Sequence, residues 1–263
     1  ADPKRWHYGS SFDPAKIDND YSSFTKILTD LDVKILWMDA KHNEIADSIF
    51  TYDASFMTPK GAILLSLGKP LRKGEEKIHE AFYKKNNIPI IGRLSGSASA
   101  EGGDIFWVDK ETVVIGKSFR TNQEGIEQIK RIFNAFNVIV VSFDLPFFLG
   151  SEACLHMMSL ISIVGYKKAL TYKPLLPIGL VQLLEKKGYK LIKAPEDEFI
   201  SSEGLNINVL AINPIECVMI CGFPKTKKAL EKNGVNVHTF DGNSLCIGCE
   251  GGPTCLTRPI LRE

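Results

Sequence analysis

The sequence predicts an α/β protein, a five-bladed α/β propeller of ββαβ repeats around a pseudo-five-fold axis, in a single domain spanning residues 1–263. Three observations predict this fold. Amphipathic helices recur about every 50 residues, a short strand follows most of them, and one or two apolar strands precede most of them. Such alternation places helices outside the sheets. An open doubly wound sheet is the alternative, but it has one strand per helix, so the paired strands favour the ring.

Five segments have apolar residues three or four positions apart, which is the spacing of an amphipathic helix. In the first, Tyr21, Phe24, Leu28 and Leu31 share one face. The predicted helices cover residues 21–31, 74–86, 122–136, 178–187 and 225–233. Asn-Asn, Lys-Gly and Asn-Gly pairs follow several of them and suit tight C-terminal caps, after which a strand can begin.

Short apolar runs on both sides of these helices predict the strands. Five strands are expected after a helix, at residues 33–38, 88–91, 137–141, 189–193 and 235–239. Pairs are expected before a helix, at residues 50–57 with 62–66, 105–108 with 112–115, and 206–212 with 217–220. A further apolar run begins near His156, and we expect it to be a strand as well. Together these elements make five ββαβ units.

Size and charge exclude several classes of protein. The chain has 263 residues, of which 44% are hydrophobic, enough for a large core without disulfides or metals. Lys and Arg number 32 and Asp and Glu 31, so the net charge of +1 predicts no general attraction to nucleic acid or anionic membranes. No apolar run of about 18 residues predicts a membrane-spanning helix, and no signal-peptide pattern opens the sequence. We therefore expect a cytoplasmic protein.

Six cysteines lie in the second half of the chain, at positions 154, 217, 221, 246, 249 and 255. Their density is not that of a small secreted disulfide scaffold, so a reduced protein is expected. Two pairs, at 217 with 221 and at 246 with 249, could supply four thiolates for zinc. Alternation along a strand places Cys217 and Cys221 on one buried face, however, so a core pair is preferred. A disulfide of Cys246 or Cys249, with each other or with Cys255, is a further hypothesis.

The C-terminal sequence Glu-Gly-Gly-Pro-Thr-Cys, residues 250–255, is the segment richest in chemistry. Two glycines and a proline predict a tight loop whose backbone can approach a ligand closely. We expect Cys255 to stand where this loop enters an apolar strand, and a thiol in such a place can be activated as a thiolate nucleophile. A buried structural cysteine is the alternative.

Acidic residues in two segments are candidates for binding a cation. Glu101 and Asp104 bracket a glycine pair just before a predicted strand, so the chain can pass close to a substrate there. Asp47 and Asp53 belong to a second acidic segment upstream. Solvated carboxylates in turns are the alternative for both.

Two arginines and a histidine complete the set of candidates. Arg120 precedes a helix that Thr121 or Asn122 can cap, where a bidentate contact with a carboxylate can form. Arg72 lies downstream of the acidic segment. Surface charge is the alternative for both arginines, and a hydrogen-bonded core histidine is the alternative for His156.

The order of these segments carries more information than any one of them. It reads Asp-x-x-x-x-x-Asp, Arg, Glu-Gly-Gly-Asp, Ser-x-Arg-Thr-Asn, His and Gly-Gly-Pro-x-Cys. This order resembles the pentein superfamily of guanidino-group-modifying enzymes, and within it dimethylarginine dimethylaminohydrolases and arginine deiminases. Agmatine deiminases and amidinotransferases belong to the same group. The resemblance covers nearly the whole chain and agrees with the five-repeat pattern.

The resemblance implies a role for each candidate. Cys255 matches the nucleophile, and His156 matches the residue that moves protons to the leaving amine and from the incoming water. Glu101 and Asp53 match the acids that hold the guanidinium nitrogens. The remaining matches concern substrate binding: Arg120 and Arg72 at the α-carboxylate, Asp47 near the α-amino group, and Asp104 as the last residue of the Glu-Gly-Gly-Asp motif.

The implied reaction is hydrolysis of a guanidinium C–N bond through a covalent thiouronium intermediate. A guanidinium is a poor electrophile, so two carboxylates that localise its charge assist the attack, and a thiolate is a better nucleophile than a neutral hydroxyl near neutral pH. No metal or organic cofactor is expected. The expected partner is a small guanidino substrate, arginine or a methylated arginine, with no nucleic acid or membrane and with a homodimer as an option.

Dimethylarginine dimethylaminohydrolase, which forms citrulline and dimethylamine, is the activity that we expect first. Met158 stands where arginine deiminases carry an Asp, and Glu250 resembles the acid of mammalian-type dimethylarginine hydrolases. The Gly-Gly-Pro-x-Cys loop instead looks like that of arginine deiminases, and Tyr52 replaces an acid common in dimethylarginine hydrolases. Arginine deiminase or arginine dihydrolase is therefore the alternative. An amidinotransferase and a non-catalytic, ribosome-binding protein of the same fold are less favoured.

Overall fold

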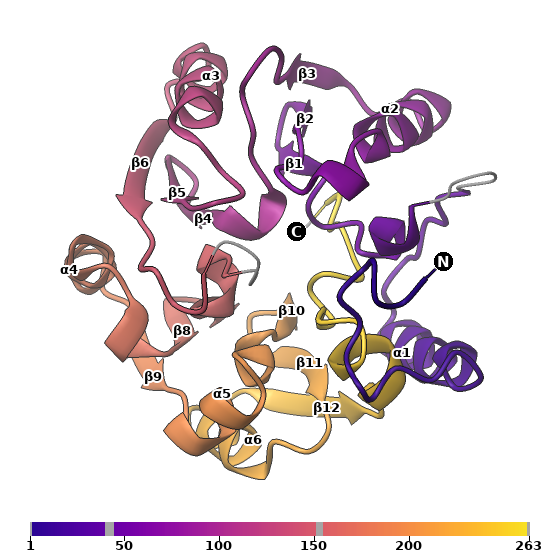
Figure 1. Cartoon of the computed structure of the whole chain (residues 1–263). Coiled ribbons are helices and arrows are strands. Elements are labelled where there is room, and N and C mark those ends of the chain that lie inside the picture. The colour runs from indigo at the N-terminus through magenta and orange to yellow at the C-terminus, as the bar shows by residue number, and fades with distance from the viewer. Residues whose placement is uncertain (1, 40–44, 151–154, 262–263) are drawn as a thin grey trace. The chain divides into compact units, whose positions relative to one another are not determined.

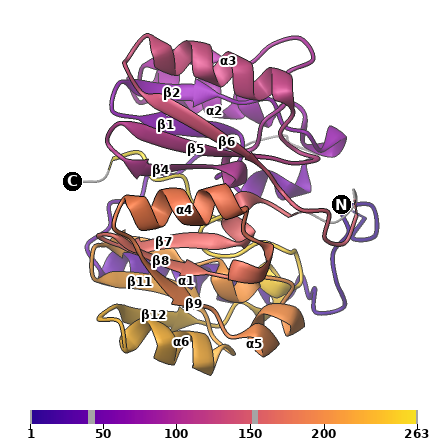
Figure 2. The same ribbon diagram turned by 90° about the vertical axis from the view of Figure 1, so that its left-hand side faces the viewer.

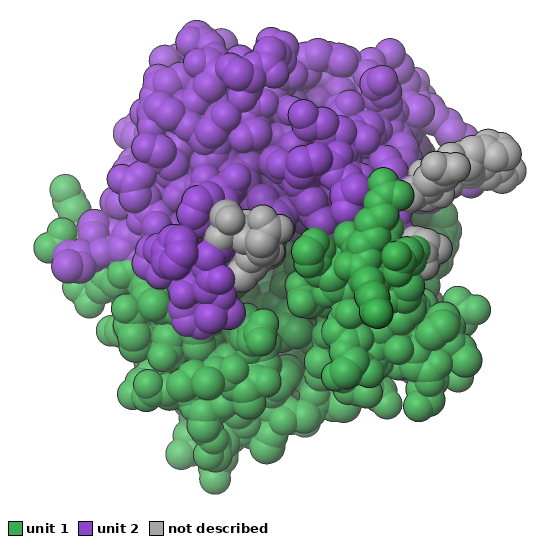
Figure 3. Space-filling model, viewed as in Figure 1, with its two compact units in different colours: residues 1–37, 159–176, 181–256 green, residues 38–158, 177–180, 257–263 purple. Residues whose placement is uncertain are grey.

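The computed structural model describes residues 2–39, 45–150 and 155–261, so Cys154 lies outside the described residues. Contacts divide the chain into two compact units (Figure 3). Unit 1 comprises residues 1–37, 159–176 and 181–256, and unit 2 comprises residues 38–158, 177–180 and 257–263. The single domain expected from the sequence stays a prediction.

Unit 2 contains two three-stranded sheets of the expected ββαβ type. The first has β1 (Ser55–Thr58), β2 (Gly61–Leu64), α2 (Glu75–Lys85) and β3 (Ile90–Arg93). The second has β4 (Ile105–Asp109), β5 (Thr112–Lys117), α3 (Gln123–Asn134) and β6 (Ile139–Asp144). In each sheet the first two strands form an antiparallel hairpin, and the helix returns the chain so that the third strand pairs parallel to the second.

Unit 1 contains two more sheets with the same order and pairing. One has β7 (Ile161–Gly165), β8 (Lys168–Thr171) and β9 (Lys190–Lys193), with α4 (Ile178–Lys186) between the last two in sequence. The other has β10 (Leu210–Asn213), β11 (Glu216–Ile220), α6 (Pro224–Glu231) and β12 (Asn236–Phe240). Four of the five predicted ββαβ units are thus present in the described residues.

The α3 helix shows how the sequence pattern produces the packing (Figures 1 and 2). Asn122 caps its N-terminus, because its side chain accepts the backbone N–H of Gly125 at 2.8 Å. Ile126, Ile129 and Phe133 point into the core of unit 2, where none is more than 1% exposed. This helix packs on β5 and β6 and thereby holds the sheet whose first strand follows the Glu-Gly-Gly-Asp motif.

The N-terminal helix α1 (Ile17–Asp30) packs within unit 1, where the Phe24 and Phe240 rings lie 5.0 Å apart. Asp20 on this helix accepts the backbone N–H groups of Ser244 at 2.9 Å and Leu245 at 3.0 Å. These amides open a one-turn π-helix, η7 (Asn243–Ile247), and would otherwise lack intrahelical partners. One carboxylate therefore ties the start of the chain to the segment that leads into the Cys255 loop.

Two expected strands are absent from the described residues, and a third begins later than expected. Residues 33–38 pair with no other strand, and Leu36 and Trp37 are 41% and 63% exposed, so no burial drives them into a sheet. The run that begins at His156 first forms a 3₁₀ turn, η4 (Met157–Ser159), and becomes a strand, β7, only at Ile161. Cys255 lies in a turn and is followed by irregular chain. The short helix α5 (Glu196–Ser201) was not expected.

Among the described residues, no helix is both long and apolar enough to cross a membrane.

Candidate active site

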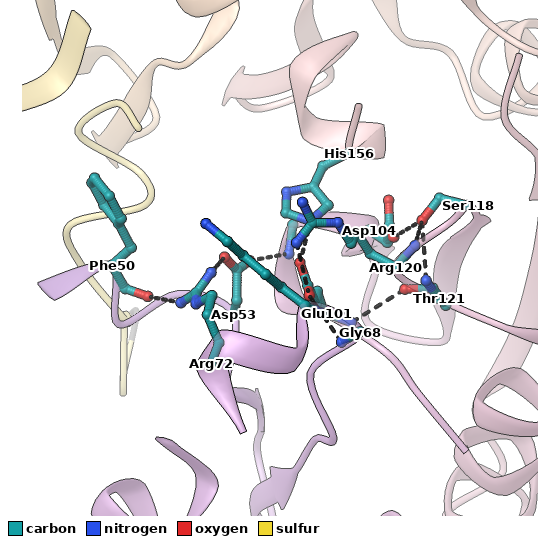
Figure 4. Close-up of polar contacts among 12 residues, drawn as sticks. Phe50, Asp53, Gly68, Arg72, Glu101, Asp104, Ser118, Arg120, Thr121 and His156 are labelled. Carbon is teal, nitrogen blue, oxygen red and sulfur yellow. Dashed lines mark hydrogen bonds and ion pairs between the residues drawn. The ribbon is translucent and has the colours of Figure 1, made fainter. Parts of the chain in front are cut away.

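Glu101 is the central residue of the candidate site, which lies in unit 2 (Figure 4). It stands immediately before a 3₁₀ turn, η3 (Gly102–Asp104), that leads into β4. The side chain is fully buried, and Oε1 accepts the backbone N–H groups of Gly68 at 2.9 Å and Lys69 at 3.1 Å. These bonds satisfy the buried carboxylate and hold it in one orientation.

The second oxygen of Glu101 lies 2.8 Å from Nε2 of His156, which is itself 8% exposed. Burial acts to raise the pKa of Glu101. The hydrogen bond and charge of His156, together with the guanidinium groups of Arg72 and Arg120, outweigh burial and lower the pKa to about 2. Glu101 is therefore ionised at neutral pH, and it can orient His156 and stabilise the imidazolium form.

The two glycines of the motif make room for neighbouring groups. A Cβ atom on Gly103 would lie 2.4 Å from Nδ1 of His156, and one on Gly102 would lie 2.2 Å from the carbonyl oxygen of Tyr52. Neither distance is compatible with a side chain. The glycine pair therefore lets the imidazole and the Tyr52–Asp53 backbone approach Glu101 from two directions.

Asp53 completes a cluster of acceptors. Its Oδ1 accepts the backbone N–H of Gly103 at 2.9 Å, and its Oδ2 accepts Nη1 of Arg72 at 2.7 Å. Asp53, Glu101 and His156 each offer one atom, and these atoms lie within 4.8 Å of one another. By distance, such a cluster can hold a guanidinium or a metal ion. Since two arginines add positive charge here, a singly charged, delocalised guanidinium fits better than a divalent ion.

Arg72, expected at a substrate carboxylate, is bound to acids of the protein. Its Nε and Nη2 atoms each lie 2.8 Å from one oxygen of Glu75, and Nη1 binds Asp53. It is 5% exposed. Burial raises the pKa of Glu75 to about 7, against the opposing effect of Arg72. Sequence reasoning missed Glu75, because an acid in the first turn of a helix is ordinary. In this structure Arg72 holds Asp53 in place rather than facing a ligand.

Asp47 and Arg120 occupy different surroundings. Asp47 lies in the 3₁₀ turn η1 (Ala46–Ile49), and its Oδ2 is 2.6 Å from Nζ of Lys69. A substrate ammonium would have to share or replace this lysine. Arg120 lies beside Glu101, with Nη1 3.6 Å from Oε1, and its side chain is 14% exposed. Of the two predicted carboxylate-binding arginines, Arg120 has the more exposed side chain, at 14% against 6% for Arg72.

Asp104 supports the site instead of facing it. Its Oδ2 accepts the hydroxyl of Ser118 at 2.6 Å, and its Oδ1 accepts the backbone N–H of Met157 at 2.9 Å. The Ser118 hydroxyl oxygen in turn accepts the backbone N–H groups of Arg120 and Thr121. A single buried carboxylate thus fixes the turn that carries Arg120 and the residue next to His156. The bond to Met157 also explains why a turn forms where a strand was expected.

Cys255 lies in unit 1, partly exposed, in the turn that follows the glycine pair. Its Sγ accepts Nδ2 of Asn208 at 3.0 Å, and Oδ1 of Asn208 accepts the backbone N–H of Thr254 at 2.9 Å. Sequence reasoning missed Asn208. The only sequence feature that could have indicated Asn208 is its polar side chain between two apolar neighbours, shortly before β10.

The other cysteines that the structure describes form neither a metal-binding group nor a disulfide. No disulfide joins the five described cysteines to one another. Cys217 is buried as expected, but Cys221 is exposed because β11 ends at Ile220, so the two do not form the expected core pair. Within residues 2–39, 45–150 and 155–261, no cysteines combine into a group with metal-binding distances.

Known proteins resemble this chain over most of its length. A family model described as arginine deiminase matches residues 40–177 and 174–262. The chain is 27% identical to the uncharacterized protein YkgA of Bacillus subtilis over 94% of its own length and 81% of that protein. It is 26% identical to the arginine deiminase of Borrelia garinii, over 82% of this chain. It spans only 61% of that enzyme's length.

Solved structures share the fold. A cysteine-to-serine variant of DDAH from Pseudomonas aeruginosa, complexed with citrulline, superposes with a TM-score of 0.77 at 23% identity, covering 93% of this chain and 88% of that one. The N-terminal domain of ArgZ, an arginine dihydrolase from cyanobacteria, superposes with a TM-score of 0.77 at 19% identity, covering 95% and 89%. The family match spans most of the chain, as the resemblance seen in the sequence predicted. The protein belongs to the arginine deiminase family, within the pentein superfamily.

Proposed function

We propose that the protein hydrolyses a guanidinium C–N bond of an arginine-type substrate through a covalent intermediate on Cys255. The observation that carries this proposal is the buried pair of Glu101 and His156, 2.8 Å apart, with Asp53 beside it. Acceptors in this arrangement suit a planar cation with several N–H donors, and an imidazole next to an ionised carboxylate suits proton transfer. Family membership supports the same reaction class.

In the proposed reaction, Glu101 and Asp53 accept hydrogen bonds from the guanidinium and orient its carbon. The Cys255 thiolate attacks that carbon and forms a tetrahedral adduct. The imidazolium of His156 donates a proton to the departing nitrogen, the C–N bond breaks, and a thiouronium remains. Neutral His156 then takes a proton from water, which attacks the same carbon. The C–S bond breaks, and citrulline and the free thiolate are released.

Each step needs an ionised Glu101, because the carboxylate stabilises His156 as imidazolium before the first proton transfer. The pKa of about 2 supports this requirement throughout the neutral range. Arg120 is the residue that we assign to the substrate carboxylate. Asp47 is assigned to the α-ammonium in competition with Lys69, whose Nζ lies 2.6 Å away.

For the substrate, we propose asymmetric dimethylarginine, with citrulline and dimethylamine as products. Met158, two residues after His156, has an apolar thioether that suits a methylated nitrogen better than one carrying two N–H groups. Arginine is the second candidate, hydrolysed to citrulline and ammonia by a deiminase or further by a dihydrolase. The arginine deiminase family model favours it.

Three further features belong to the proposal. The four ββαβ sheets and α1 are proposed to be five parts of a propeller around a pseudo-five-fold axis. A reduced, cytoplasmic setting fits a mechanism that needs a free thiolate. A homodimer is a prediction that sedimentation would test.

The test compares the wild-type protein with Cys255→Ser, and with Cys221→Ser as a matched control at an exposed cysteine. Each is incubated under reductant with arginine, monomethylarginine, asymmetric dimethylarginine and agmatine, with and without EDTA. Citrulline, ammonia and dimethylamine are measured together. Dimethylamine with citrulline, lost only in Cys255→Ser, supports the first candidate, and ammonia from arginine supports the second. No product from any substrate, or full activity of Cys255→Ser, would overturn the proposed function.

A further inference from the structure

The side chain of Asn208 contacts the Cys255 loop at two adjacent points. Its Nδ2 donates to Sγ of Cys255 at 3.0 Å, and its Oδ1 accepts the backbone N–H of Thr254 at 2.9 Å. All three residues belong to unit 1. One amide group therefore touches both the sulfur and the backbone that carries it.

The orientation of this amide follows from its partners. A backbone N–H can only donate, so the atom facing Thr254 must be the oxygen of Asn208. The atom facing the sulfur is then the NH₂ group, which is a donor. A donor at this position favours the charged thiolate over the neutral thiol.

The backbone around Asn208 is fixed. Ile207 and Val209 on either side are buried, at 0% and 2% exposed. The hydroxyl of Ser162, on β7, donates to the carbonyl of Ile207 at 2.6 Å and accepts the N–H of Val209 at 3.4 Å. Asn208 therefore projects from a rigid segment, as a group that positions a nucleophile must.

The loop is shaped around this amide. A Cβ atom on Gly252 would lie 2.3 Å from Cγ of Asn208, so the glycine leaves the space that the amide fills. The backbone carbonyl of Cys246 accepts the N–H of Gly251, at the start of the loop, at 3.0 Å. Burial raises the pKa of Cys246 well above its usual value, so this neighbouring thiol stays protonated.

We propose that Asn208 is a positioning residue that stabilises the thiolate of Cys255 and directs its Sγ. The assignment rests on the proposed function in that it takes Cys255 as the nucleophile. The ionisation of Cys255, however, is measured without substrate, so the two can fail separately.

The experiment measures the rate of alkylation by iodoacetamide from pH 5 to 10, with Cys255 quantified by peptide mass spectrometry apart from the other cysteines. The variants are Asn208→Ala and Asn208→Asp, with Asn236→Ala as a control at an exposed position of β12. Asn208→Asp keeps an acceptor for Thr254 but places an oxygen opposite the sulfur. Thermal unfolding confirms that each variant is folded.

We expect the midpoint of the alkylation profile to rise by about one pH unit in Asn208→Ala, and further in Asn208→Asp, with no change in Asn236→Ala. The plateau rate at high pH reports access to the sulfur, so a shift of the midpoint alone separates ionisation from unfolding of the loop. We expect kcat at pH 7 to fall about tenfold in Asn208→Ala and to recover as the pH rises. A midpoint in Asn208→Asp equal to that of the wild type would overturn the role of Asn208. A shifted midpoint in a protein that turns over no guanidine would leave that role standing and sink the proposed function.

Discussion

Glu101 is a fully buried carboxylate that remains charged, because two backbone amides, His156 and two arginines compensate for its removal from water. Since its pKa is about 2, this carboxylate does not titrate between pH 4 and pH 9. The rate should therefore show no rise or fall with pH in that range that is caused by Glu101. Its contribution to stability is present above about pH 4.5 and is lost only as the pH falls toward 2.

Replacing Glu101 by Gln tests whether its charge is needed. The amide oxygen can still accept the N–H groups of Gly68 and Lys69, so the NH₂ group would face His156 without a negative charge. We expect kcat to fall about 100-fold or more, the scale of lost acid–base assistance. The exposed Glu111→Gln is the matched control, and citrulline formation is the readout. Unchanged turnover in Glu101→Gln would show that the carboxylate has no part in proton transfer.

The sequence predicted which residues form the candidate site only where those residues belong to a recognisable motif. Glu101, Asp53 and His156 do lie together, as their motifs indicated. Asn208 and Glu75 were missed, because each acts on another residue and neither stands in a pattern of its own. Arg72 shows the opposite limit. Its position was predicted, but only the fold reveals that Glu75 and Asp53 surround it.

At the level of elements, the tight turn at η3 sets the position of His156. In Gly103→Ala, the added methyl group would lie 2.4 Å from Nδ1 of His156, so either the imidazole or the turn must shift. A displacement of this kind costs about 100-fold in kcat, with KM less affected. Gly9→Ala is the control, since its nearest neighbour would be 3.9 Å away. Steady-state kinetics check the prediction, and full kcat in Gly103→Ala would contradict it.

The α2 helix carries two buried groups that titrate in opposite senses. Burial lowers the pKa of His79 to about 3 and raises that of Glu75 to about 7. Below pH 6.5 the unfolded chain binds a proton at His79 that the folded protein does not, so stability is lost as the pH falls. Glu75 binds a proton in the folded state first, so its contribution rises as the pH falls from 7 to 4.5.

These two effects overlap between pH 6.5 and 4.5, and His79→Gln removes one of them. We expect the free energy of unfolding of this variant to gain about 2–3 kcal/mol relative to the wild type over that interval, from about 1.4 kcal/mol per pH unit for one group. Urea unfolding at the two pH values measures the difference, with the exposed His7→Gln as the control. Parallel pH dependence in His79→Gln and wild type would show that His79 titrates normally.

The spacing of apolar residues in the sequence predicted those helices that bury one whole side against a sheet. All five predicted helices form, with ends displaced by a few residues. The expected strand at residues 33–38 fails because an apolar run needs a partner strand as well as apolar residues, and Leu36 and Trp37 stay exposed. The strand predicted to begin at His156 starts only at Ile161, for another reason. The carboxylate of Asp104 binds the backbone at Met157, and no local pattern records a bond between residues 53 positions apart.

At the scale of the whole molecule, the described cysteines do not cross-link the chain. No disulfide joins the five described cysteines to one another, and burial raises the pKa of Cys217 to about 12. We expect the Tm to be the same within about 2 °C with and without dithiothreitol, since no disulfide joins the described cysteines. Differential scanning calorimetry is the measurement. A Tm that falls by more than about 5 °C on reduction would indicate a disulfide.

The bond between Asp20 and the amides of Ser244 and Leu245 joins residues more than 220 positions apart. During synthesis the carboxylate emerges early, whereas the amides that it binds are among the last to be made. The Asp20 carboxylate therefore has no amides to bind until the chain is almost finished, and contacts of such separation form late in folding. A nascent chain, or one cut short before residue 243, has the acids of unit 2 but lacks the segment that carries Cys255.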